Sequence, residues 1–135
     1  MAKVEARPGR PLSPHLTVFR PYVNMMMSIL HRMTGAANTL GSVLVAVWLT
    51  AAASGQEAFY TVNGLFATPV GLLILLGFSW SLIHHALGGI RHFIWDTGRG
   101  LSIGAIRMLS WATILCSLAL TGALWFIGLM KMGML

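Results

Sequence analysis

Charged residues are distributed unevenly along this chain of 135 residues, and three long stretches contain no Asp, Glu, Lys or Arg. These uncharged stretches are residues 33–56, 58–90 and 108–130. A helix needs about 20 predominantly apolar residues to cross the hydrocarbon core of a bilayer, so each stretch is long enough. The pattern predicts an all-α membrane protein with transmembrane helices at residues 24–54, 66–96 and 104–130.

The composition agrees with a membrane protein that forms one small helix bundle. Hydrophobic residues make up 56% of the chain and charged residues only 9%, whereas about 25% of residues are charged in a soluble domain. Three spans leave no room for a second domain, so residues 1–135 form a single unit. The one cysteine, Cys116, excludes an intrachain disulfide and is typical of a small apolar packing residue.

The basic residues lie almost entirely on one side of the predicted spans. Eight of the nine precede the first uncharged stretch or lie between the second and third: Lys3, Arg7, Arg10, Arg20, Arg32, Arg91, Arg99 and Arg107. Because basic residues favour the cytoplasmic side, we predict a cytoplasmic N-terminus, or a matrix-facing one in a mitochondrion. This topology explains the net charge of +6, so we expect no nucleic-acid partner.

Residues 1–21 precede the first span and contain four prolines, which prevent a continuous amphipathic helix. No apolar region follows the first basic residues closely enough for a cleavable secretory signal. We interpret this segment as an extended cytoplasmic arm that lies along a partner protein. A disordered tail is the alternative that composition alone leaves open.

Histidines and paired glycines stand together near the end of the second predicted span. His85 and His92 are seven residues apart and share a helix face, and Gly88 and Gly89 leave that face bare beside the His85 imidazole. Histidine is costly in hydrocarbon, so a histidine beside a notch favours a haem site within the membrane. His84 points about 100° away, so both cannot face one iron. A histidine that only bonds a neighbouring helix is the alternative.

A second polar group is expected at the start of the first span, where Ser28, His31 and Arg32 are helical neighbours. The second span runs in the opposite direction, so Arg91 and His92 come to the same depth. Two spans would therefore bring polar side chains together near the cytoplasmic boundary. The alternatives are arginines that reach the lipid headgroups, an interfacial His92, and a Ser28 hydroxyl that bonds a carbonyl of its own helix.

Three motifs in this order resemble one known family. Residues 28–35 read S-I-L-H-R-M-T-G, residues 85–92 read H-A-L-G-G-I-R-H with Asp96 shortly beyond, and residues 10–16 read R-P-L-S-P-H-L. Each is similar to a signature of the cytochrome b membrane-anchor subunit of succinate dehydrogenase, respiratory complex II. One departure is Phe19, where many members have tyrosine.

The resemblance implies a haem b shared with a second small membrane anchor. It assigns His85 as the axial ligand of the haem iron and places His31, Arg32 and His92 near the haem propionates. Ser28 and Arg32 match family positions at a quinone site. Asp96 matches an acidic position near the same opening, where a helix-end salt bridge is an equal alternative.

The resemblance also implies partners and a location. Succinate is oxidised on a flavoprotein subunit, an iron–sulfur subunit carries the electrons, and no catalytic residue lies on this chain alone. We expect a multi-pass protein of the bacterial inner membrane, rather than the mitochondrial one, and ubiquinone rather than menaquinone. An anchor of a quinol:fumarate reductase uses similar parts and stays open. A haem-free structural anchor would lack the ligand histidine, and a metal transporter would need acidic or sulfur ligands near its histidines.

Overall fold

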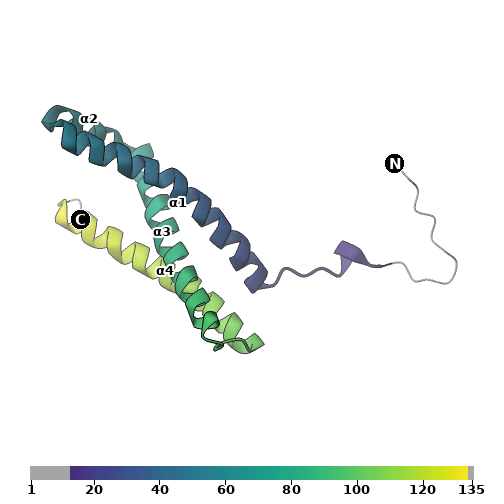
Figure 1. Ribbon diagram of the computed structural model, residues 1–135. Helices are drawn as coiled ribbons and strands as arrows, with labels where there is room; N and C mark the ends of the chain where they lie inside the picture. The colour runs from purple at the N-terminus through teal and green to yellow at the C-terminus, as the bar shows by residue number, and fades with distance from the viewer. Residues whose placement is uncertain (1–12, 134–135) are drawn as a thin grey trace, which may run out of the picture.

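The computed structural model describes residues 13–133, and every regular element in that range is helical. In chain order these elements are η1 (His15–Thr17), α1 (Val23–Ser54), α2 (Gln56–Phe66), α3 (Pro69–Asp96) and α4 (Ile103–Lys131) (Figure 1). Only α1, α3 and α4 are long and apolar enough to cross a membrane. The predicted all-α fold with three transmembrane helices is confirmed.

The three long helices run antiparallel to one another in sequence order. As a result, the start of α1, the end of α3 and the start of α4 meet at one end of the bundle (Figure 1). Helix α3 packs against both α1 and α4, so it is the central helix of the bundle. At that end, residues 13–22 lead away from the helices (Figure 1). Residues 1–12 of the predicted arm lie outside the described residues.

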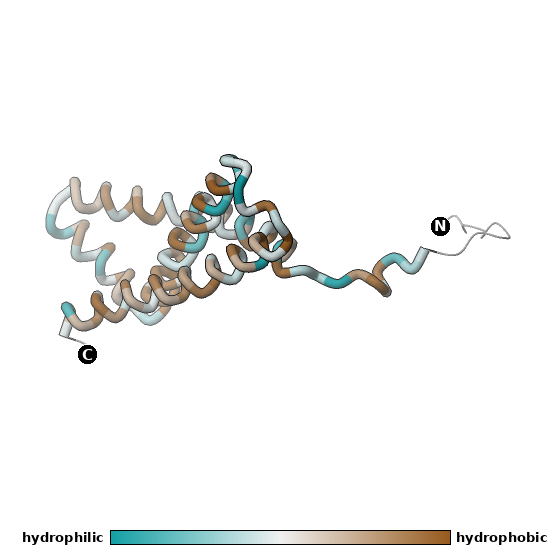
Figure 2. Tube along the Cα trace, turned by 90° about the horizontal axis from the view of Figure 1, so that it is seen from below, coloured by the Kyte–Doolittle hydropathy of each residue, from teal (hydrophilic) through white to brown (hydrophobic). Residues whose placement is uncertain are grey.

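The interior of the bundle is polar and its surface is apolar, which is the reverse of a soluble protein. Met27 and Ala51 are the only buried hydrophobic side chains in residues 13–133. The buried polar residues are Thr34, Ser81, His84, Arg91, Ser110, Thr113, Ser117 and Thr121. Figure 2 shows hydrophobic positions along all three long helices. Small and polar residues between helices, with apolar residues outside, are typical of packing in lipid.

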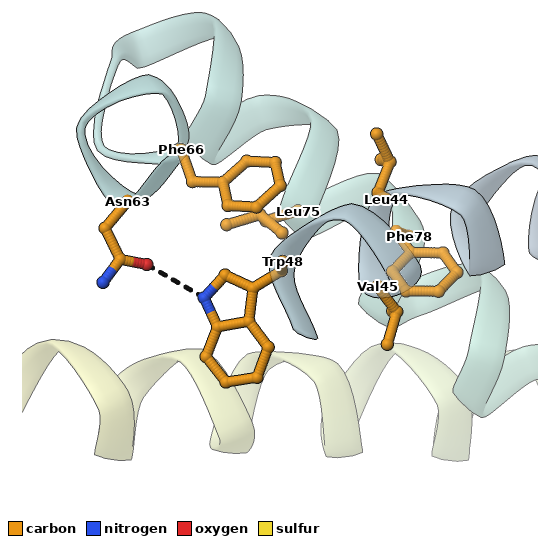
Figure 3. Close-up of a pocket in the computed structure, with 7 residues that line it drawn as sticks. All are labelled: Leu44, Val45, Trp48, Asn63, Phe66, Leu75 and Phe78. Atoms are coloured by element: carbon orange, nitrogen blue, oxygen red, sulfur yellow. Dashed lines mark hydrogen bonds between the residues drawn. The ribbon is translucent and has the colours of Figure 1, made fainter. Parts of the chain in front are cut away.

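Helix α2 occupies the connection between the first two spans, where the hydropathy pattern predicts no separate helix. The chain turns at Gly55, whose φ of 123° suits glycine, and α2 then folds back along α1. The Trp48 indole Nε1 donates a hydrogen bond to Oδ1 of Asn63 at 2.9 Å, which ties α1 to α2 beside a small apolar pocket (Figure 3).

Helix α3 begins at Pro69, three residues after the position 66 that the hydropathy pattern indicates. The Thr68 hydroxyl caps the helix by accepting a hydrogen bond from the Gly71 backbone N–H at 3.1 Å. Proline suits the first helical position because it has no N–H to satisfy there. The Thr-Pro pair is therefore the local signal that separates α3 from α2.

Candidate functional site

Three histidines from two helices form a continuous array near the end of the bundle where α1 begins. The His31 ring from α1 stacks on the His85 ring from α3, with centroids 4.0 Å apart and planes inclined by 15°. On its other side His31 meets the edge of His92, at 5.3 Å and 60°. The structure thus brings together all three predicted histidines, and His31 lies between the two from α3.

The hydrogen bonds of His85 determine which of its nitrogens carries the proton. Its Nδ1 lies 3.1 Å from the backbone carbonyl oxygen of His31 and 3.3 Å from the Thr34 hydroxyl. A carbonyl oxygen only accepts, so Nδ1 carries the hydrogen and donates it. In the neutral ring the lone pair is then on Nε2, which has no partner among the described residues and is not enclosed by them. A histidine that ligates a metal through Nε2 has this arrangement.

His84 lies on a different face of α3 from this array, toward α4. Its side chain is 0% exposed, and its Nδ1 lies 3.0 Å from the Ser117 hydroxyl on α4. That hydroxyl donates its one hydrogen to the carbonyl oxygen of Ile114, so it accepts from Nδ1–H of His84. The remaining Nε2 of His84 is enclosed by protein. The two adjacent histidines thus face different helices, as their angular separation predicts.

The notch predicted beside His85 is only half open. A side chain at Gly88 would collide with Cδ2 of the His31 ring, whereas nothing lies within 4 Å of the corresponding position at Gly89. The prediction of a bare face at both glycines is therefore wrong at Gly88. The group that fills the space at Gly88 is the His31 ring, which belongs to α1. The contact between α1 and α3 is tertiary, so the pattern of residues within α3 alone does not predict it.

Replacing Gly88 with alanine should destabilise the helix pair α1–α3, because the added methyl group displaces His31. Overpacking of this kind costs about 1–3 kcal/mol. Heating the purified complex and following the monodisperse fraction by size-exclusion chromatography would measure the loss. Gly77→Ala on the same helix is the matched control, since a Cβ there meets nothing within 4 Å. Equal loss in both variants would contradict the assigned contact.

A pocket of about 560 Å³ opens beside the histidine array. It is lined by Asn24, Met25, Ser28, His31, Arg32, Arg91, His92, Trp95, Leu101 and Ile106. The predicted convergence of Ser28 and Arg32 from the first span with Arg91 and His92 from the second is thus observed. Ser28 and Arg32 are exposed in it.

The Ser28 hydroxyl differs from most serine and threonine hydroxyls in these helices. Thr34, Ser42 and Ser110, for example, donate to carbonyl oxygens of their own helix. The Ser28 hydroxyl makes no hydrogen bond with any residue in the range 13–133, so the alternative of a back-bonded serine is not what the structure has. It is available to a molecule in the pocket.

The pocket is lined by polar nitrogens that lack partners within residues 13–133, and those of Arg91 and Trp95 can only donate. His31 Nε2, Arg91 Nε and Trp95 Nε1 are buried and have no partner among the described residues. Arg91 is only 3% exposed, and its guanidinium lies 5.0 Å from the centre of the Trp95 ring and 3.5 Å from the Ser110 hydroxyl. No carboxylate lines the pocket. An arginine buried this way needs an acceptor, so the donor set fits an anionic or carbonyl-bearing ligand.

The sequence places Arg91 in the polar group near the membrane boundary, with a topology anchor as the alternative, and does not predict its burial. The available signal is its position, seven residues after His84 and three after Gly88, which places it on the interior face of α3. Asp96 is exposed at the end of α3 and does not line the pocket. Within residues 13–133 it forms no salt bridge with Arg91 or Arg99, so the helix-end ion pair is not observed.

A metal transporter that uses the three histidines of α3 would need their side chains to lie together. His84 bonds Ser117 on α4, whereas His85 and His92 flank His31 from α1. No group of three or more His, Cys, Asp or Glu side chains in the described range is placed to hold a metal ion. The three histidines of α3 therefore do not form one ligand set.

Fold and site define a membrane-embedded helix bundle with a polar interior and a donor-rich pocket at one end. Residues 6–124 match the family described as "Succinate dehydrogenase/Fumarate reductase transmembrane subunit". The chain belongs to this family of membrane subunits.

Individual relatives cover most of the chain. It is 37% identical over 123 residues to the succinate dehydrogenase cytochrome b556 subunit of Rickettsia bellii, covering 91% of this chain and 96% of the relative. The subunit of the same name from Paracoccus denitrificans is 40% identical over 114 residues, covering 84% and 88%. The mitochondrial cytochrome b560 subunit of Sus scrofa is 38% identical over 97 residues, covering 70% and 57%. The resemblance seen in the three motifs is confirmed.

Proposed function

We propose that this chain is a haem b-binding membrane anchor of a succinate:quinone oxidoreductase and forms part of its quinone-reduction site. The observation that carries the proposal is the state of His85. Its Nδ1–H is held by the His31 carbonyl, its Nε2 has no partner among the described residues, and its ring stacks on His31, which lines the pocket together with Arg91 and Trp95. An oriented imidazole next to donors without acceptors suits a cofactor that has a metal and carboxylates.

His85 would be the axial ligand from this chain, and a histidine of a second small anchor would supply the opposite ligand. His31, Arg32 and His92 would hold the propionates, and the buried Arg91 adds a further charge of the right sign. Haem b, when bound, accepts and returns one electron. The hydrogen bond from His85 Nδ1 to the His31 carbonyl would fix the orientation of the ring.

Ser28 and Arg32 would bind the quinone at the mouth of the pocket. Reduction of a quinone requires two electrons and two protons, and negative charge develops on its carbonyl oxygens. A hydroxyl and a guanidinium directed at one oxygen stabilise that charge most where water is excluded. Both side chains line the pocket, and the Ser28 hydroxyl is not engaged by its own helix. Asp96, near the same end of the bundle, would help to deliver protons.

The remaining parts of the proposal follow from the family. A flavoprotein and an iron–sulfur subunit would dock on the basic, cytoplasmic side, at the end of the bundle where residues 13–22 lead away from the helices (Figure 1). The Rickettsia and Paracoccus relatives support a bacterial inner membrane. The relatives named here are succinate dehydrogenase subunits, which favours succinate oxidation over the reverse reaction of a quinol:fumarate reductase. Ubiquinone would be the quinone, on the resemblance of residues 10–16 to the family's opening motif.

The direct test is a reduced-minus-oxidised visible spectrum of the purified complex containing this chain. We expect the absorption bands of a b-type haem. These bands should disappear when the anchor subunits are removed from the complex. A complex that oxidises succinate with a soluble acceptor and shows no such bands would make this chain a haem-free anchor. That result would refute the haem assignment without affecting membership of the family.

A further inference from the structure

We propose that His84 and Ser117 form a positioning pair that fixes the rotation of α3 and thereby directs His85 Nε2 to the haem iron. This inference rests on the proposed function, in which His85 is the axial ligand. His84 itself touches neither haem nor quinone. It acts through its neighbour in the sequence.

The bond between the two side chains is fully enclosed. His84 and Ser117 are both 0% exposed, and Nδ1 lies 3.0 Å from the hydroxyl oxygen. The single hydrogen of the Ser117 hydroxyl is donated to the Ile114 carbonyl at 2.9 Å, so the hydroxyl oxygen is held in place by its own helix. The acceptor for His84 is therefore pre-oriented, which favours one rotation of the histidine ring.

Adjacent residues on a helix project about 100° apart, so a bond on one side of α3 constrains the other side. His84 is held by α4 through Ser117, and His85 is held by α1 through the His31 carbonyl at 3.1 Å. Rotation of α3 in either direction lengthens one of these bonds. The close contact of Gly88 with the His31 ring limits the same motion.

No other side-chain bond between α3 and α4 in residues 13–133 lies as close to His85. Arg91 approaches Ser110 at 3.5 Å, six residues after His85, and Trp125 donates to Ser79 at 2.8 Å, six residues before it. The Arg91 distance is at the limit of a hydrogen bond. The His84–Ser117 pair is thus the local determinant of the orientation of α3 at the ligand.

The test variant is Ser117→Ala in the assembled complex, measured by redox titration of the haem and by exposure of the reduced complex to carbon monoxide. We expect the haem to be retained, its midpoint potential to rise, and a fraction of the ferrous haem to bind carbon monoxide. A poorly aimed imidazole is a weaker donor to ferric iron and leaves its coordination position more readily. A change in packing alone would not produce this combination.

Thr113→Val and Thr121→Val are the matched controls. Both residues are buried on the same face of α4, and their hydroxyls bond only carbonyl oxygens of α4, at 2.8 Å each. We expect both controls to keep the wild-type potential and to exclude carbon monoxide. Ser117→Thr, which keeps the hydroxyl, should restore the wild-type values.

A wild-type potential without carbon monoxide binding in Ser117→Ala would overturn the positioning role. The same shift in Thr113→Val, or in Ser117→Thr, would overturn it as well, because the hydroxyl would not be its cause. Should Ser117→Ala fail to assemble, Ser117→Cys takes its place with the same outcomes, since a thiol is a weak acceptor. Retention of haem in His85→Ala would instead refute the ligand assignment, so the two failures are distinguishable.

Discussion

Replacing His85 with alanine should abolish haem incorporation into the complex, or reduce the haem content to a small fraction of the wild-type value. The variant removes the histidine whose Nδ1–H is held by the His31 carbonyl and whose Nε2 has no partner among the described residues and is not enclosed by them. An axial ligand is a covalent attachment for which the surrounding donors do not substitute. Haem content per complex, from the pyridine haemochrome spectrum, measures the loss. The substitution leaves the three apolar spans unchanged, so the anchor should still reach the membrane.

The adjacent histidine provides the control for this experiment. His84→Ala should keep most of the haem, because the His84 imidazole is turned into the contact between α3 and α4 and is 0% exposed. The two variants remove the same chemical group one position apart. Normal haem content in His85→Ala together with loss in His84→Ala would reverse the assignment of the ligand. Loss in both variants would point to general damage to α3.

Features that depend on one helix at a time could be predicted from the sequence. The uncharged stretches located the three spans, and the angular separation of His84 and His85 put them on different faces. The convergence of Ser28 with His92 followed from antiparallel spans and their depth, because both positions lie near the same membrane boundary. Each of these inferences uses only helix geometry and the thickness of the bilayer.

The features that were missed depend on how helices approach one another. The His31 ring fills the space at Gly88 because α1 and α3 pack closely there, and no periodicity within α3 specifies that distance. The burial of Arg91 is a similar case, since its partners are Trp95 and a serine from α4. Helix α2 was missed for another reason. It spans 11 residues on the bundle surface, which is too short to cross a membrane and too apolar to stand out as a loop.

The polar interior links the fold to the proposed chemistry. In lipid, helices gain little from burying apolar surface, so small side chains and hydrogen bonds between helices hold the bundle together. Ser81 donates to the Thr34 carbonyl or to Asn38 of α1, and His84 donates to Ser117 of α4. The same class of interaction therefore stabilises the bundle and orients the histidines at the end that carries the proposed site.

Arg32→Leu should slow electron transfer to quinone by ~10²–10³-fold, the usual cost of removing a donor that stabilises developing charge. Ser28→Ala should have a smaller effect, because the hydroxyl is neutral. Oxidation of succinate with a soluble artificial acceptor should stay near the wild-type rate in both variants, since the reactions that precede the quinone occur on other chains. The measurement is the ratio of the two rates in the purified complex.

Haem spectra recorded with these rates separate two roles of Arg32. A slower quinone rate with an unchanged haem spectrum places the guanidinium at the quinone, whereas a shifted spectrum shows that it also contacts a propionate. Arg107→Leu is the control for lost positive charge, because Arg107 is exposed near the start of α4 and does not line the pocket. Quinone rates at the wild-type level in both Arg32→Leu and Ser28→Ala would refute the site. The two residues would then serve only as the interfacial start of α1.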